Sequence, residues 1–270
     1  MKTSRIVLSA AVVAIISFSF TFQVTQNTQA AAPKLRTQKN VAFKRGEKLK
    51  YRIHYGLVDA GVATLEVAND TMMIAKRPTL HVIARGVTNS VWDKVYAVRD
   101  KYESYIDEDA ILPWYHIRRV NEGGYKIEHD ITFNHFKKEA IINKNRYKTD
   151  TNTQDMISAL YYARTLDFAS AKAGDLFTIN TFFDFENYPL KLKYMGTQVI
   201  STSVGKINCY KFHPVMQKGR VFKTEEDMTV WISADENKIP VRLQTNILVG
   251  SIKMDLIEYS GLAATLNKQK

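Results

Sequence analysis

The chain contains little cysteine, glycine or proline: its 270 residues include one Cys, 12 Gly and 6 Pro. With Cys209 alone, an internal disulfide and zinc sites built from several cysteines are both excluded. The few Gly and Pro residues follow no repeat period, which excludes collagen-like and mucin-like chains. We therefore expect a folded protein in which Cys209 packs as a small apolar side chain.

Catalytic signatures are also missing. The sequence has no Gly-x-Ser-x-Gly elbow, no His-Glu-x-x-His pair and no glycine-rich phosphate-binding loop. His129 and His135 would lie about 20 Å apart on a strand, too far for one metal ion. We predict no catalytic residue, no cofactor and no metal, and we favour a non-enzymatic protein. A hydrolase with an unrecognised site near Asp184 and Glu186 stays open as a second alternative.

Acidic residues are the sparser charged class, with 27 Asp and Glu against 38 Lys and Arg. Without Lys2 and Arg5, a chain starting at Ala31 has 36 basic and 27 acidic residues, a formal charge of +9. This charge favours anionic lipid or glycan surfaces. No basic block or nucleic-acid motif is present, so we expect no nucleic-acid partner.

A long apolar run occurs only near the amino terminus. The basic start Met1–Arg5 is followed by apolar residues 6–22, a polar stretch and Ala30-Ala31-Ala32. This layout is typical of a secretory signal, and we predict that residues 1–30 are a signal peptide cleaved after Ala30. The prediction implies a periplasmic protein without a stable transmembrane anchor after processing. An uncleaved anchor is the alternative, because the run approaches the roughly 17 residues that begin to span a bilayer.

After a polar tether over residues 31–42, the sequence alternates as a strand does. Leu49, Tyr51, Ile53 and Tyr55 alternate with polar residues, which indicates a strand with one buried face. Similar segments recur at short intervals from 62 to 134 and from 176 to 258. We predict a mainly β protein, with many short strands in a curved antiparallel sheet or open β-barrel. It would form a single domain over 43–260, followed by a tail over 261–270.

Two details refine this predicted sheet. Gly61 offers a place for the bulge or bend that a curling sheet needs. Two separate β domains remain an alternative, although no linker rich in Gly, Pro or Ser supports a boundary. The carboxylates of 107–109 and 225–227 fall at predicted turns, where we expect them to be solvated.

One segment has helical rather than strand periodicity. Thr153 can cap a helix with Asp155 in its first turn, apolar residues then follow at helical spacing to Phe168, and Gly174 lies beyond the end. We predict one central α-helix packed on the sheet as a plug or lid.

Arg164 lies on the apolar side of this predicted helix. It either forms an ion pair with Asp167 or holds a phosphate or carboxylate at the mouth of an apolar cavity. For the second case we predict a ligand site in which Arg164 faces the polar head. The tail would then contact Leu160, Tyr161, Phe177 and Phe183, although aromatic side chains of this kind are also typical of a packed core.

Three segments resemble one exported bacterial family, known as domain of unknown function 3108. They are the opening Gly46–Val67, the helical Asp155–Arg164, and the closing pair Val230–Asp235 and Ile239–Leu243. The resemblance covers the chain from about 43 to 258. It implies an exported, mostly β protein and supplies no established activity.

Together these observations favour binding of an apolar or amphiphilic envelope molecule, such as a lipid or glycolipid. An envelope assembly module that binds a protein or an anionic glycan is the alternative. The choice depends on whether the interior of the sheet is hollow or packed.

Overall fold

The computed structural model describes residues 34–215, 228–246 and 251–269. The chain divides into two units, Met1–Pro33 and Lys34–Lys270, and the description below concerns the second. The predicted signal peptide, its cleavage after Ala30 and the carboxylates of 225–227 lie outside the described residues.

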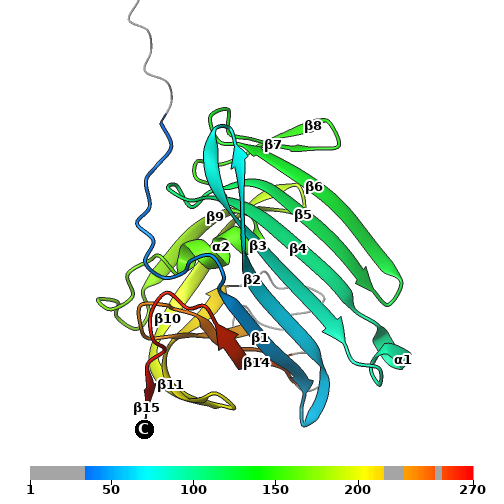
Figure 1. Ribbon diagram of the computed structural model, residues 1–270, viewed down its shortest axis with the longest axis vertical. Coiled ribbons are helices and arrows are strands. Elements are labelled where there is room, and N and C mark those ends of the chain that lie inside the picture. Colours follow the sequence, from blue (N-terminus) through cyan, green and yellow to red (C-terminus); the bar gives the residue numbers. More distant parts are fainter. Residues whose placement is uncertain (1–33, 216–227, 247–250, 270) are drawn as a thin grey trace, which may run out of the picture. The chain divides into compact units, whose positions relative to one another are not determined.

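In this described part of the chain, fifteen strands form one sheet in which every ladder is antiparallel (Figure 1). The first half contains β1 (Lys48–Tyr55), β2 (Val58–Ile74), β3 (Arg77–Thr88), β4 (Arg99–Asp107), β5 (Pro113–Glu122), β6 (Tyr125–Asn134), β7 (Glu139–Ile142) and β8 (Asn145–Lys148). The second half contains β9 (Leu176–Phe183), β10 (Glu186–Thr202), β11 (Gly205–Val215), β12 (Met228–Ser233), β13 (Pro240–Asn246), β14 (Ser251–Ser260) and β15 (Lys268–Gln269).

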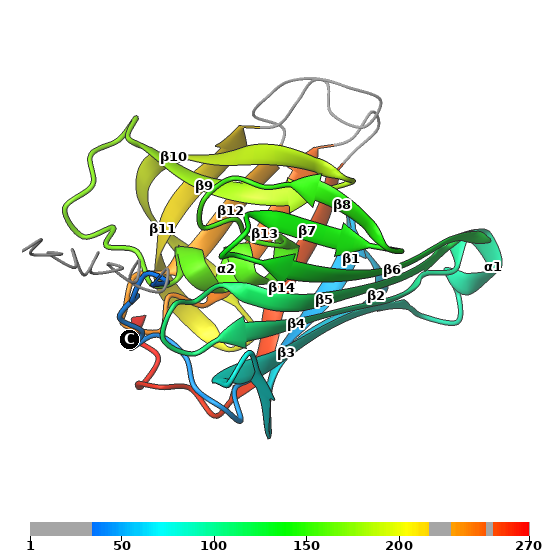
Figure 2. The same cartoon turned by 90° about the horizontal axis from the view of Figure 1, so that it is seen from above.

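The two halves join where β1 pairs with β14. The strand order is β8-β7-β6-β5-β4-β3-β2-β1-β14-β13-β12-β11-β10-β9, and β15 pairs with β11. No ladder links the outer strands β8 and β9, so the curved sheet is not closed (Figure 2). The mainly β, curved antiparallel fold is thereby confirmed.

The predicted bulge at Gly61 is also confirmed. The β1–β2 pairing shifts register between Ile53, which faces Gly61, and His54, which faces Asp59. A side chain at Gly61 would place its Cβ 2.2 Å from the carbonyl oxygen of Val87. Only glycine lets β2 and β3 approach this closely.

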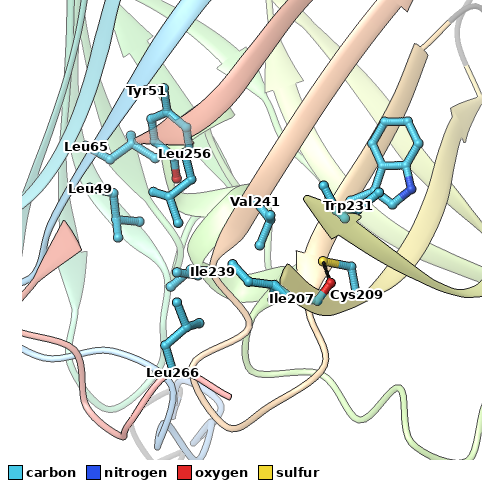
Figure 3. Close-up of a cluster of buried hydrophobic side chains, with 11 residues drawn as sticks. Leu49, Tyr51, Leu65, Ile207, Cys209, Trp231, Ile239, Val241, Leu256 and Leu266 are labelled. Atoms are coloured by element: carbon cyan, nitrogen blue, oxygen red, sulfur yellow. Dashed lines mark hydrogen bonds between the residues drawn. The ribbon is translucent and has the colours of Figure 1, made fainter. Parts of the chain in front are cut away.

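Alternation on each strand builds an inner apolar face and an outer polar face. On β1, Leu49 and Tyr51 are buried while Lys48 and Arg52 are exposed. Inner side chains from β1, β2, β11, β12, β13 and β14 meet in one core cluster (Figure 3). Cys209 lies there, fully buried, and burial raises the pKa of its thiol to about 12. It therefore packs as an apolar residue.

The predicted helix is shorter than its apolar spacing indicates. It is α2 (Met156–Ala163), and its N-cap is Asp155 rather than Thr153. Asp155 accepts hydrogen bonds from the backbone of Ile157 and Ser158, while the Ser158 hydroxyl accepts from the Asp155 backbone N–H. This capping box fixes the start of the helix. After Ala163 the chain turns, so Phe168 packs from a loop.

The structure departs from the sequence pattern in three further places. The alternation over 95–106 predicts one strand, but the second helix, α1 (Asp93–Tyr96), overlaps its start. The segments 190–195 and 198–203 each have the pattern of a separate strand, but they form the single strand β10, whose pairing is irregular around Gly196. The short hairpin of β7 and β8 was not predicted.

Candidate functional site

Arg164, the C-cap of α2, is buried, with about 1 % of its surface exposed. Its carboxylate partner is Glu47, which lies just before β1 and is also buried. Nη1 and Nη2 each donate to one Glu47 carboxylate oxygen at 2.6 Å. Nη2 and Nε also donate to the carbonyl oxygens of Ala42 and Asn237, both at 3.0 Å. The expected pair with Asp167 is not formed: Asp167 instead accepts from the backbone of Ala169.

The surroundings of Arg164 keep it charged. Burial alone would lower the pKa of the guanidinium, but the hydrogen bonds and charge of Glu47 outweigh burial and raise it. The rings of Phe43 and Tyr161 lie 5.1 and 4.9 Å from the guanidinium carbon. Four of its five N–H donors are satisfied within the protein. The arrangement is a buried ion pair that ties α2 to the chain segment before β1.

The other four predicted tail contacts do not form one group. Leu160 packs against the inner core and lines a cavity. Tyr161 is fully buried, with its ring 4.7 Å from Phe43 and edge-on to it. Phe177 packs edge-on against Phe168 at 4.9 Å, whereas Phe183 lies under the guanidinium of Arg118 at 4.9 Å. The structure thus brings Leu160, Tyr161 and Arg164 to one helix and places the two phenylalanines elsewhere.

An apolar hollow with a volume of about 490 Å³ lies at one end of the inner face. We call it the rim cavity. Its walls come from β1, β2, β3, β14 and the α1 region, with Ile53, Tyr55, Gly61, Gly86, Trp92, Tyr96, Val98 and Ile252 among its lining residues. Apart from His54 and Thr88, the lining residues have apolar or aromatic side chains or are glycine. Gly86 of β3 leaves this part of the face unfilled, because a Cβ at that position would meet no atom within 4 Å.

A second apolar hollow, which we call the helix cavity, lies between α2 and the strands β9–β13. Its volume is about 310 Å³. Met156, Leu160 and Ala163 of α2 form one wall, and Leu192 and Leu243 contribute to the other. Of the predicted tail contacts, Leu160 is the one that lines this cavity.

Strand register places the two cavities on the same face. Leu243, which lines the helix cavity, pairs with Met254 on β14. Met254 in turn pairs with Ile53, which lines the rim cavity. An apolar row therefore runs across β13, β14 and β1 from one cavity to the other.

The opposite wall of the inner face contains a small buried polar cluster among its apolar side chains. His116 of β5 is buried, and its Nδ1 lies 3.6 Å from a carboxylate oxygen of Asp155. The other oxygen of Asp155 accepts from the hydroxyl of Ser104 at 2.6 Å. Because the Ser104 hydroxyl donates to Asp155 and not to His116, the histidine is not placed to act as a base on that hydroxyl. Sequence reasoning missed this cluster, whose members come from β4, β5 and the N-cap of α2.

The residues named for a hydrolase do not converge on a cleft. Asp184 is largely exposed and forms an ion pair with Arg118 at 2.6 Å, and Glu186 is exposed. In the ranges that the structure describes, no three His, Cys, Asp or Glu side chains are grouped as a metal site.

None of the helices in the described ranges has the length and apolar character that crossing a membrane requires.

Comparison with solved structures shows the fold. A β-barrel-like protein of the DUF1849 family from Brucella abortus aligns with a TM-score of 0.53 at 10% identity, over 79% of this chain and 96% of that one. A candidate lipoprotein from Parabacteroides distasonis aligns at 0.38 and 11% identity, over 84% and 100%. A candidate exported protein with a YmcC-like fold from Bacteroides fragilis aligns at 0.35 and 10% identity, over 83% and 100%.

No curated protein matches the chain. The model of one family, described as "Protein of unknown function (DUF3108)", matches residues 50–257, which include β2 to β13 and both helices. This match covers most of the chain and agrees with the motifs quoted above. The chain therefore belongs to the DUF3108 family.

Proposed function

We propose that this protein binds an apolar or amphiphilic molecule of the bacterial envelope on the inner face of its sheet, after export to the periplasm. The observation that carries the proposal is the rim cavity, an apolar hollow of about 490 Å³ in which Gly86 faces open space. Ligand pockets commonly have volumes of about 300–1,000 Å³ and mostly apolar walls. In this proposal α2 is the central plug, lying between β4 and β9 and forming a wall of the helix cavity (Figure 2).

The walls suit an acyl chain better than a polar ligand. Transfer of an acyl chain from water to an apolar site gains about 0.8 kcal/mol per methylene, so ten methylenes would gain about 8 kcal/mol before the entropic cost of binding. A polar head would stay at the open end of the rim cavity, in contact with solvent. The row from Ile53 through Met254 to Leu243 would let a longer chain extend toward Leu160.

Arg164 is already paired with Glu47, which bears on its predicted contact with a polar head group. A head group at Arg164 would have to displace Glu47, which already accepts from both of its terminal nitrogens. The head-group role of Arg164 stays a prediction, and the same holds for Tyr161, Phe177 and Phe183 as tail contacts. Leu160 is supported by its position in the helix cavity.

Gly86 offers a direct test of the rim cavity. It lies on β3, on the face of Val82 and Ala84, and a Cβ added there meets no atom within 4 Å. A Gly86→Leu side chain would project into the cavity without a backbone clash. Gly86→Ala is the matched control, since it changes the same backbone position and adds only one carbon.

The measurement is binding of cis-parinaric acid, a fluorescent fatty acid, together with native mass spectrometry of protein purified from the periplasm. We expect the wild type and Gly86→Ala to bind the probe, and Gly86→Leu to bind it at least about tenfold more weakly at unchanged stability. Absence of both probe binding and co-purifying lipid in the wild type would refute the proposal. So would full binding by a folded Gly86→Leu variant.

A further inference from the structure

We propose that the end of the sheet around the rim cavity docks on an anionic lipid bilayer through protruding apolar side chains. We call this set of six residues the rim patch: Leu57, Val58, Val91, Val95, Tyr96 and Tyr125. All six are exposed, with Leu57 fully exposed and Val95 and Val91 at 77% and 68%. The inference goes beyond the proposed function, because it concerns the outside of the protein and holds whether or not the cavity is filled.

The six side chains come from three connections between strands: the β1–β2 turn, the β3–β4 connection that contains α1, and the β5–β6 turn. Leu57 lies in the tight turn of β1 and β2, where Tyr55 pairs with Val58. The segment that leads into α1 is fixed to β2, because Asn89 donates from its backbone to Ala60 at 2.9 Å and from its side chain to Asp59 at 2.6 Å.

Contacts of aromatic rings join the α1 region to the β1–β2 turn and to the β5–β6 turn. Tyr55 and Trp92 lie edge-on at 6.2 Å, which joins the β1–β2 turn to the start of α1. In the β5–β6 turn, Gly123 packs under the ring of Tyr96 and donates its N–H to Ala97. The β1–β2 turn and α1 accordingly lie at the same end of the sheet (Figure 1). Tyr125 follows this turn, so all six side chains of the rim patch belong to one rim.

Protruding turns of this composition suit a bilayer. A contiguous exposed apolar patch marks an interaction site, because water penalises its exposure. Aliphatic side chains at the tips can enter the acyl region, while tyrosine and tryptophan prefer the headgroup level. Here Leu57 and Val95 occupy the tips, and Tyr96 and Trp92 lie beside the cavity.

The charges around the patch favour anionic lipid. Four acidic residues lie at this end of the sheet. Asp59 is paired with Arg52 at 3.6 Å and Asp93 with Arg99 at 2.5 Å, whereas Asp100 and Glu122 lie beside one another next to the β5–β6 turn. Lys94 of α1, Lys126 of β6 and Lys253 of β14 form no ion pair with any described residue. The two arginines and these three lysines outnumber the four acidic residues, and a positive surplus favours an acidic headgroup surface. A patch of this kind would bring the open end of the rim cavity against the membrane.

Flotation with lipid vesicles tests the docking surface. The wild type should float with vesicles of phosphatidylcholine and phosphatidylglycerol, and less with phosphatidylcholine alone. Leu57→Asp/Val95→Asp should weaken partitioning by about tenfold or more, because two tip side chains can no longer be buried. Lys94→Gln/Lys253→Gln should reduce the difference between the two lipid mixtures. Met72→Asp/Met73→Asp is the matched control, since both methionines are exposed on β2 near the β2–β3 turn.

Fatty-acid binding keeps this test separate from the proposed function. The Leu57→Asp/Val95→Asp variant should still bind cis-parinaric acid as the wild type does, since Leu57 and Val95 do not line the rim cavity. Docking is disproved if the wild type ignores anionic vesicles, or if the tip variant and the methionine control float equally. A wild type that ignores vesicles but cross-links in cells to one envelope protein through Leu57 would assign the patch to a protein partner and disprove docking as well.

Discussion

At the residue scale, the polar groups inside the sheet decide which substitutions are tolerated. Arg164 and Glu47 are 117 positions apart and form a bidentate pair away from solvent. Taking two charges out of water is unfavourable, and their mutual hydrogen bonds, with those from Arg164 to the carbonyl oxygens of Ala42 and Asn237, offset that penalty. Removing one partner leaves the other charged and unpaired, which is worse than removing both.

Substitution of this pair has a distinctive outcome. Arg164→Ala should lower the free energy of unfolding by about 3–5 kcal/mol, because Glu47 is left buried without its cationic partner. The double variant Arg164→Met/Glu47→Met should be more stable than Arg164→Ala. Urea unfolding gives both values. If Arg164→Ala instead keeps its stability and loses fatty-acid binding, the guanidinium is a ligand anchor rather than a structural group.

At the element scale, Asp107 shows how one carboxylate joins three strands. The carboxylates of 107–109 were expected to be solvated, but Asp107 is buried at the end of β4. It accepts from Ala110 in the β4–β5 turn at 2.8 Å, from the indole of Trp114 on β5 at 3.0 Å, and from the guanidinium of Arg77 on β3. Burial alone would raise the pKa of this carboxyl, but these donors outweigh burial and lower it below 3.8.

The lowered pKa predicts a sign for the acid dependence of stability. Because Asp107 binds its proton more weakly in the folded state, its contribution is fully present above the ordinary aspartate pKa of 3.8 and is lost as pH falls through the lower folded value. Asp107→Asn should therefore be less stable than the wild type at neutral pH, and the difference should shrink in acid. Urea unfolding between about pH 7 and about pH 3 measures it. A difference that grows in acid would contradict this assignment.

At the scale of the whole molecule, side chains join the two ends of the sheet where no ladder does. Phe182 of β9 is buried and contacts Phe133 of β6 and Tyr147 of β8, with ring centroids 6.3 and 5.9 Å apart. Arg118 and Asp184 add an ion pair across the same junction. These contacts hold the sheet in its curve, so the shape of the inner face depends on them.

Truncation of Phe182 tests this junction. Phe182→Ala should lower the free energy of unfolding by about 3–5 kcal/mol, since it removes a buried ring and leaves a cavity. Phe136→Ala is a suitable control, because Phe136 is 44% exposed and should lose much less. Chemical denaturation measures both. Equal losses in the two variants would mean that the junction contributes little to stability.

Much of this architecture follows from the sequence, and the remainder depends on pairing across long distances. Local periodicity predicted most elements: alternation, as on β1, predicted strands, and helical spacing predicted α2. A buried face imposes such a period on neighbouring residues in the sequence. The hairpin of β7 and β8 was missed because four-residue strands carry too short a pattern. The partner of Arg164 could not be inferred, since no local spacing relates it to Glu47. The rim cavity was equally hidden, because its lining residues come from strands that are distant in the sequence and its open space beside Gly86 depends on how they are arranged.

An unclosed sheet leaves two borders onto which a foreign chain could add a strand, and this protein protects each of them differently. At one border, β8 has only four residues and presents Arg146 and Lys148, whose length and charge disfavour further pairing. At the other, Gln154 pairs with β9 in parallel, its N–H donating to Asn180 and its carbonyl accepting from Phe182. Both borders are thus guarded against aggregation, and the curved sheet can keep an open interior without polymerising edge to edge.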